Sequence, residues 1–233
     1  MVKMRKMNRK GISHLEVILS LVIFVGFTLF LLVIINPFNT TKSRYVTLDT
    51  MERGIGLETN IELSQITLSL NKDVTGCFGV ELPLEDNVIA KNENDIRFGA
   101  KRIGNKIYIA PDGKFYTVYS SREFEENDPG TNCINLVIGD YNLGLLRNYS
   151  VTSFSKVESL KEKYDSDYEN LKKELGISTS DFSFIIMDTQ GNEIIKATRS
   201  RATKINVDVR NVPVQLVYKN GTIKYVMLNI QTW

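Results

Sequence analysis

The chain begins with one long apolar run and then changes to short alternating segments. Residues 17–35 read VILSLVIFVGFTLFLLVII, nineteen residues without a charge. A helix of this length covers roughly 28 Å, close to the hydrocarbon thickness of a bilayer. A soluble helix of this length normally keeps one polar face, and this run has none. The pattern therefore predicts a single N-terminal transmembrane helix.

A second helical stretch is expected directly after this run. Pro37 is expected to end or kink the first helix, because proline lacks the backbone N–H that helix continuation needs. Apolar residues then follow at helical spacing, until Gly54 and Gly56 are expected to break the pattern. These apolar positions are Tyr45, Leu48, Met51 and Ile55.

From residue 57 onward the pattern favours short strands joined by tight turns. Asn220-Gly221 is a strong two-residue turn signal between two such strands. Three hairpins are predicted in all, pairing residues 106–110 with 114–119, residues 182–187 with 193–197, and residues 212–219 with 223–230. The C-terminal part is therefore expected to be an antiparallel meander.

One amphipathic helix is predicted within this β-rich region, over residues 156–175. Ser155 and Glu158 fit a capping box, and Gly176 stands where a helix commonly ends. The apolar stripe consists of Val157, Leu160, Tyr164, Tyr168, Leu171 and Leu175. The predicted fold class is α+β: an N-terminal transmembrane helix followed by a β-rich antiparallel outer domain with one amphipathic helix.

The distribution of charge predicts orientation and argues against one class of partner. Five Lys or Arg residues and no acid lie in the first ten positions, whereas only Lys42 and Arg44 closely follow the apolar run. This asymmetry predicts a cytoplasmic N-terminus and a C-terminal domain outside the cell. Beyond residue 40 acidic residues slightly outnumber basic ones, so we expect no nucleic-acid partner.

The content of reactive residues argues against an enzyme. His14 is the single histidine and the chain has two cysteines, which excludes a Ser-His-Asp triad in the folded part and a Cys-rich metal site. No phosphate-binding loop or nucleophile–base pair is evident. The acidic run at residues 123–128 is interpreted as a hydrated turn rather than a cation site. We therefore expect no catalysis, no cofactor and no metal.

The segment before the apolar run, RKGISHLE at residues 9–16, carries the most specific signal. It resembles the class III signal of the type IV pilin superfamily, in which a prepilin peptidase cuts after a glycine that follows Lys or Arg. Lys10 and Gly11 match that junction, and Glu16 would be the fifth residue of the mature chain. The new N-terminus would be Ile12 where bacterial pilins commonly have Phe, which favours an archaeal-type or minor pilin. The resemblance covers about residues 6–36.

The resemblance implies a filament subunit, either a major or minor pilin or a pseudopilin. Its partners would be a prepilin peptidase, an assembly ATPase with a membrane platform protein, membrane lipid, and other pilin-like subunits. The Glu16 carboxylate would pair with the Ile12 ammonium of a neighbouring subunit and set the register. The regions would be a leader at 1–11, a hydrophobic helix with its extension at 12–56 and an extracytoplasmic domain at 57–233. The subunit would be a single-pass membrane protein that reaches the cell surface when assembled.

Two other functions remain open at this point. No small-residue cleavage pattern follows residue 36, so the helix is expected to stay attached as an anchor. A single-span anchored binding or receptor domain with an uncleaved leader is the main alternative. A membrane-tethered enzyme is the third hypothesis, for which no reactive constellation is found.

Covalent features are also expected in an exported domain. Cys77 and Cys133 are predicted to form a disulfide, which could contribute roughly 4 kcal/mol in the chain-entropy model. Two separate buried thiols are the alternative. Three sequons mark possible glycosylation at Asn39, Asn148 and Asn220, although Asn220 also fits the predicted turn.

Overall fold

The fold was obtained as a computed structural model of the 233-residue chain. It describes residues 9–35, 40–110, 113–177, 179–200 and 205–233, and within these ranges side chains at residues 16–31 and from residue 47 onward. The chain divides into two compact units, residues 1–45 and residues 46–233. The predicted boundary was residue 57, whereas this division falls inside a helix. The second unit is called the body below.

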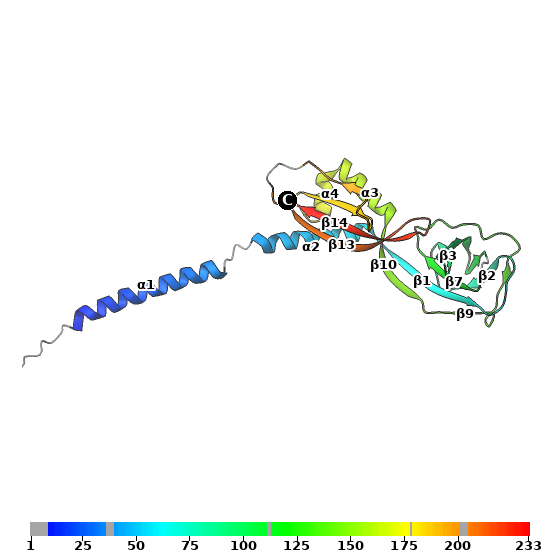
Figure 1. The fold of residues 1–233 in the computed structure, drawn as a ribbon, viewed down its shortest axis with the longest axis horizontal. Helices are drawn as coiled ribbons and strands as arrows, with labels where there is room; N and C mark the ends of the chain where they lie inside the picture. Colours follow the sequence, from blue (N-terminus) through cyan, green and yellow to red (C-terminus); the bar gives the residue numbers. More distant parts are fainter. Residues whose placement is uncertain (1–8, 36–39, 111–112, 178, 201–204) are drawn as a thin grey trace, which may run out of the picture. The chain divides into compact units, whose positions relative to one another are not determined.

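Four helices and fourteen strands make up the described part of the chain (Figure 1). The helices are α1 (Arg9–Ile35), α2 (Thr40–Thr59), α3 (Phe154–Ser166) and α4 (Tyr168–Glu174). The strands are β1 (Asn60–Leu70), β2 (Phe78–Glu81), β3 (Val88–Asn92), β4 (Arg97–Phe98), β5 (Ala100–Ile103), β6 (Lys106–Ile109), β7 (Phe115–Ser120), β8 (Ile134–Asn135), β9 (Tyr141–Leu143), β10 (Arg147–Ser153), β11 (Phe182–Met187), β12 (Glu193–Ala197), β13 (Asp208–Val217) and β14 (Ile223–Thr232).

The predicted transmembrane helix is corrected by the structure. In the described part of the chain, no helix combines the length and the apolar character needed to cross a bilayer. The prediction of a single N-terminal transmembrane helix is therefore wrong as part of the fold class.

A ten-stranded sheet runs through the whole body, in the order β12-β11-β14-β13-β10-β1-β7-β3-β4, with β9 also paired to β1. Most pairs are antiparallel, but β10 and β13 are parallel at Thr152↔Leu216 and Ser153↔Val217. The predicted all-antiparallel domain is therefore wrong in this respect. The connection from β10 to β13 runs through α3, α4, β11 and β12, so it is long enough to join a parallel pair.

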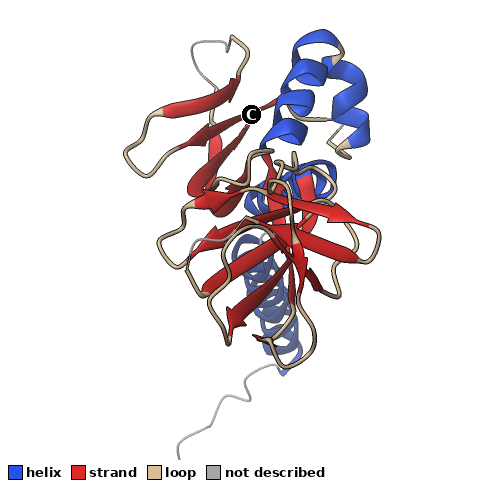
Figure 2. Cartoon of the chain, turned by 90° about the vertical axis from the view of Figure 1, so that its right-hand side faces the viewer, coloured by secondary structure: helices blue, strands red, loops and turns tan. Residues whose placement is uncertain are grey.

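One end of the body, which we call the helical lobe, consists of β11–β14 with α3, α4 and the body part of α2. In Figures 1 and 2, α3 and α4 lie beside these strands. The buried core joins one face of the strands to all three helices, through residues such as Met51, Tyr164, Phe184 and Leu216. Two predicted hairpins are confirmed here, because β11 pairs with β12 and β13 pairs with β14, the latter around Asn220-Gly221. The predicted antiparallel meander is wrong, because β14 pairs with β11 and β12 is not adjacent to β13.

The predicted helix 156–175 is in fact two helices. Asp167 separates α3 from α4 with a non-helical backbone (φ −143°, ψ 61°). The break serves the packing of two tyrosines against the start of β11. Tyr164 donates its O–H to the Phe182 carbonyl at 2.8 Å, and the Tyr168 hydroxyl accepts from the Phe182 amide at 2.9 Å. The N-cap is Ser153, which accepts from the Lys156 amide, and not the predicted Ser155.

The other end of the body is a sandwich, which we call the sandwich lobe. Here β1, β3, β4, β7 and β9 of the large sheet face a second sheet of order β5-β6-β2-β8. One apolar core, including Leu68, Phe78, Ile107 and Val118, fills the space between them. The predicted hairpin of residues 106–110 and 114–119 is wrong. Both strands exist, but β6 pairs with β5 and β2, whereas β7 pairs with β1 and β3.

Candidate assembly interface

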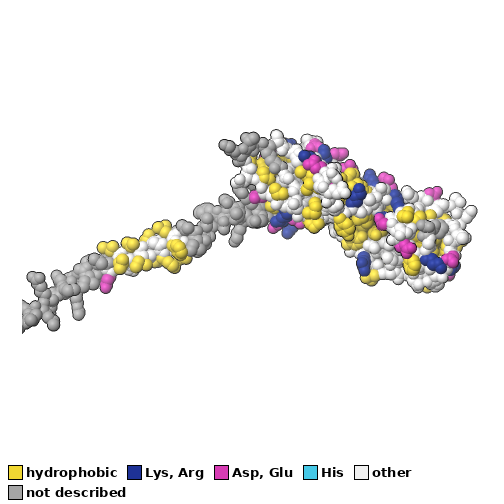
Figure 3. Space-filling view, in the orientation of Figure 1, with side chains coloured by type: hydrophobic (Ala, Val, Ile, Leu, Met, Phe, Trp, Pro, Cys, Tyr) yellow, Lys and Arg dark blue, Asp and Glu magenta, His cyan; other side chains and the backbone are white. Residues whose placement is uncertain are grey.

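The described part of α1 is apolar on every side. Its large hydrophobic side chains between residues 17 and 31 are 37–67% exposed, and Figure 3 shows hydrophobic side chains along the face of this helix that is in view. Thr28, one of its few polar residues, donates its hydroxyl to the Phe24 carbonyl at 2.8 Å, so this group is satisfied within the helix. An apolar surface of this extent is unfavourable in water and marks a surface that another apolar surface covers.

The predicted processing and register residues lie at the start of this helix. Lys10, Gly11 and Ile12 belong to the backbone of α1, but their side chains lie outside the described residues. Glu16 is described and exposed, directly before the apolar positions. An exposed carboxylate at this point is chemically able to pair with a cation from another molecule.

Helix α2 is attached to the body by a buried apolar stripe. Leu48, Met51 and Ile55 lie one turn apart and are almost fully buried in the core of the helical lobe. These are three of the four positions predicted for the amphipathic stretch, and the Tyr45 side chain lies outside the described residues. The predicted break at Gly54 and Gly56 is wrong, since α2 continues to Thr59.

Gly54 has a packing role instead of a helix-breaking one. A Cβ atom at this position would lie 2.9 Å from Leu175 Cδ2 and 3.4 Å from the Leu175 backbone. A larger residue at this position would require the Leu175 side chain to shift, so glycine suits the close approach of α2 to the end of α4. Nearby, Thr59 donates its hydroxyl to the Ile55 carbonyl at 2.7 Å and so satisfies a buried polar group in the last turn.

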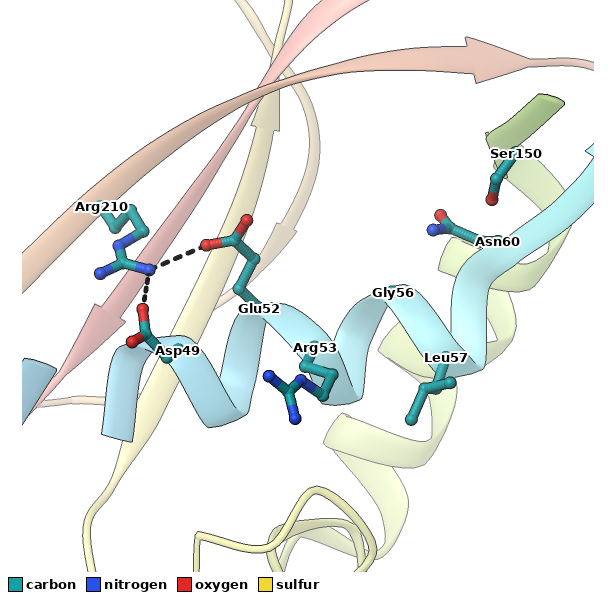
Figure 4. Close-up of a pocket in the computed structure, with 8 residues that line it drawn as sticks. All are labelled: Asp49, Glu52, Arg53, Gly56, Leu57, Asn60, Ser150 and Arg210. Carbon is teal, nitrogen blue, oxygen red and sulfur yellow. Dashed lines mark hydrogen bonds and ion pairs between the residues drawn. The ribbon is translucent and has the colours of Figure 1, made fainter. Parts of the chain in front are cut away.

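A charged fork fixes the same helix to β13. The Arg210 guanidinium donates to Glu52 at 2.9 Å and also to Asp49, one turn earlier on α2 (Figure 4). The hydrogen bond to Glu52, and after it the weaker effect of the hydrogen bond to Asp49, raises the pKa of Arg210 above its ordinary value. No sequence signal pointed to this fork, because Arg210 lies far along the chain from both carboxylates.

Beside the fork, the exposed side of α2 borders an open groove of about 720 Å³. The groove is lined by Asp49, Glu52, Arg53, Gly56, Leu57, Asn60, Ser150 and Arg210. Leu57 is 78% exposed, and Figure 4 shows Arg53 and Leu57 projecting from the side of α2 away from Arg210. This face combines an exposed cation with an exposed apolar side chain, a mixture suited to contact with another protein.

The two cysteines are joined by a disulfide bond between Cys77 and Cys133. Each cysteine directly precedes a strand of the second sheet, β2 and β8 respectively. The Ile134 amide also donates to the Cys77 carbonyl at 2.9 Å, which aligns the two strands in parallel. Disulfides of this kind persist mainly in oxidising compartments.

The three sequons differ in their surroundings. Asn148 is exposed on β10, opposite Ser64 of β1. Asn220 is exposed in the β13–β14 turn, where its side chain accepts from the Thr222 amide at 3.0 Å and stabilises the turn. Asn39 lies outside the described residues.

The acidic run at residues 123–128 organises the loop that contains it. Glu126 accepts from the amides of Val88 and Arg102, at 3.3 and 3.0 Å. Glu123 accepts from the Ser153 hydroxyl. Within the described ranges, no three His, Cys, Asp or Glu side chains gather as ligands for a metal ion. These two carboxylates thus hold neighbouring segments of the body together.

Comparisons of the chain with protein family models, with curated proteins and with solved structures gave no match.

Proposed function

We propose that the chain is a type IV pilin-like subunit, a pilin or pseudopilin, that is processed after Gly11 and assembled through its apolar N-terminal helix. The observation that carries the proposal is an apolar helix with exposed side chains on every side, directly after a Lys10-Gly11 junction and Glu16. In a filament, helices of this kind pack against one another, and the apolar surface of each is then removed from water.

Processing and charge give assembly its register in this proposal. A prepilin peptidase removes residues 1–11 and creates an ammonium group at Ile12. Glu16 of one subunit then pairs with that ammonium on a neighbour. A carboxylate enclosed among apolar helices is costly unless it is paired, so packings that leave Glu16 unpaired are disfavoured. An assembly ATPase and a platform protein would supply the subunits.

The body would be displayed outside the cytoplasm by the assembled helices. The Cys77–Cys133 disulfide supports this location. The buried stripe of α2 and the Arg210 fork hold residues 46–59 of this helix within the body itself.

Mass spectrometry of the N-terminal peptide tests the processing step. We expect the chain recovered from cells to begin at Ile12, with Gly11→Val blocking both cleavage and entry into filaments. Ser20→Ala, beyond the junction, is the control and should be processed normally. A mature chain that begins at Met1 or Val2, or a Gly11→Val chain that still assembles, would contradict the proposal and favour an anchored binding domain.

The register step has a separate test. Glu16→Ala should leave cleavage intact and reduce incorporation when it is expressed together with the wild-type subunit, whereas Glu16→Asp should restore part of it. Filament-bound and free protein can be compared by immunoblotting of sheared filaments. Equal incorporation of the Ala variant would show that Glu16 does not set the register.

A further inference from the structure

The sandwich lobe carries a cavity of about 370 Å³ on the face of the large sheet opposite the second sheet. It is lined by Thr67, Leu68, Ser69, Glu93, Phe115, Tyr116, Thr117, Asn142, Leu143 and Gly144. Side chains alternate along a strand. On β1, Leu68 is buried in the sandwich core, so Thr67 and Ser69 point to the opposite face. The volume is within the range of small-ligand sites.

Strand pairing brings the polar groups of the cavity together from distant parts of the sequence. Thr67 of β1 lies directly opposite Thr117 of β7. Ser69 lies between Phe115 of β7 on one side and Asn142 of β9 on the other. The cavity therefore lies on three adjacent strands of a single sheet, which is a rigid base for a binding site.

Several contacts fix the shape of the cavity. A Cβ atom at Gly144 would lie 2.0 Å from Thr67 Oγ1, so only glycine permits the close approach of the chain after β9. The Gly144 amide donates to the Thr67 carbonyl at 2.8 Å. The Asn142 amide group donates to Asn71 Oδ1 at 2.7 Å, which holds it at the rim.

Glu93 reaches the opposite rim through a structured turn. The side chain of Asn92, at the end of β3, accepts from the amides of Asn94 and Ile96 at 2.9 and 3.1 Å. This arrangement fixes the turn that carries Glu93, whose own side chain is exposed. The carboxylate is thus positioned by the backbone while it remains open to a ligand.

The chemistry of the lining selects one class of ligand. Three hydroxyls, one amide and one carboxylate surround Phe115, whose side chain is 59% exposed. Glu93 is the one charged group among the described lining residues, which disfavours phosphate and other anions. A wholly apolar ligand would desolvate these polar groups without hydrogen bonds. A neutral sugar offers both an apolar C–H face for the ring and hydroxyls for the polar groups.

We propose that this cavity binds a neutral oligosaccharide, with one sugar ring stacked on Phe115 and its hydroxyls bound by Glu93, Thr117 and Asn142. The carboxylate makes the strongest of these contacts, because hydrogen bonds to a charged oxygen are stronger than those between neutral groups. The inference is independent of filament assembly and stands on the cavity alone.

The same sheet face continues beyond the cavity and favours a chain of several sugars. Along β7, Tyr119 follows Thr117 on this face, and Gln65 of β1 is paired with it. Phe115 and Tyr119 lie four residues apart, or about 13 Å along a strand. Longer oligosaccharides should therefore bind more tightly than the corresponding disaccharides.

Isothermal titration calorimetry with the full chain in a sugar-free detergent tests the proposal. The probes are cellohexaose, chitohexaose and mannohexaose, together with the neutral extended peptide (Thr-Val)₃. We expect at least one hexasaccharide to bind. Phe115→Ala should raise its Kd about tenfold or more, and Glu93→Gln about tenfold, as expected for one lost charge-assisted hydrogen bond. Phe115→Tyr should retain binding.

Ile103→Ala is the matched control, because Ile103 on β5 is 58% exposed, almost the same fraction as Phe115, but belongs to the second sheet. It should leave the Kd unchanged. Failure of all three hexasaccharides to bind at millimolar concentration would overturn the proposal, as would binding that is insensitive to Phe115→Ala. Binding of the peptide in their place would also overturn it and assign the site to an extended peptide segment.

Discussion

The two lobes of the body share one sheet but differ in what covers it. In the helical lobe, β13 and β14 are ten residues each and pair along their whole length, and three helices cover one face. In the sandwich lobe, the covering sheet contains strands as short as the two residues of β8, and a disulfide joins β8 to β2. Side-chain packing stabilises the first lobe, whereas the second combines packing with a covalent link.

This difference matches the task that each lobe performs in our proposals. The helical lobe holds residues 46–59 of α2 through its packed core. The sandwich lobe leaves one sheet face open, and the cavity there needs a fixed shape rather than a large core. A disulfide supplies fixed geometry with few residues, which suits a small sheet.

The largest effect is expected from the core of the helical lobe. Phe184 is fully buried and its ring meets Tyr164 edge-on at 5.9 Å between centroids. Phe184→Ala should lower the free energy of unfolding by about 3–5 kcal/mol, because it leaves a cavity among groups that cannot close around it. Urea unfolding can be followed by the fluorescence of Trp233, the single tryptophan, which follows β14.

The control for this variant is Leu57→Ala, on the exposed side of α2. It should change the free energy of unfolding by less than about 0.5 kcal/mol, since little apolar contact is lost. A loss below about 1 kcal/mol for Phe184→Ala would mean that the helical lobe is not held together by its packed core.

A smaller effect, in a different place, is expected from the disulfide. The paired variant Cys77→Ser with Cys133→Ser should destabilise the chain by about 2–4 kcal/mol. Hydrogen exchange should rise first in β2, β6 and β8, while β11–β14 stay protected. If the Trp233 transition moves as far as it does in Phe184→Ala, the two lobes unfold as one unit and the contrast between them is lost.

The same contrast explains which parts of the fold the sequence could predict. The β11–β12 and β13–β14 hairpins are local, and the Asn220-Gly221 turn specifies the second of them directly. The sandwich is built from segments distant in sequence. The sequence at residues 111–113 is typical of a turn, which suggested that β6 pairs with β7. The structure instead places these two strands in different sheets, whose apolar faces pack against each other.

The site residues divide in the same way. Leu48, Met51 and Ile55 were predictable because helical periodicity is a local signal. The Arg210 fork and the Thr67–Thr117 pair could not be predicted from the sequence. The fork depends on a contact between β13 and α2, and the pair depends on the pairing of β1 with β7, in each case between segments distant in sequence. Gly54 was wrongly predicted to break a helix, and nothing in the sequence indicated a role for Gly144. The role of each glycine depends on a close contact with a residue distant in sequence, which is visible only in the folded structure.

The smallest effect concerns acid stability and compares one carboxylate from each lobe. In the helical lobe, burial alone would raise the pKa of Asp181, but hydrogen bonds from Lys172 and Tyr168 outweigh it and lower the pKa. In the sandwich lobe, the hydrogen bond from Lys72, followed by that from the Val137 amide, lowers the pKa of Asp140. Both contributions to stability are present above the ordinary Asp pKa of 3.8.

Each contribution is lost as pH falls through the lowered folded-state value, because protonation then breaks the interaction. The effects are small, since both ion pairs are solvent-exposed in part and therefore screened. Asp181→Asn should weaken the Trp233-monitored transition at pH 7 and match wild type near pH 2, whereas Asp140→Asn should leave that transition unchanged at both. If both variants shift the Trp233-monitored transition equally, loss of a charge in the sandwich lobe changes the stability of the helical lobe. The shared sheet would then couple the two lobes more strongly than their separate cores suggest.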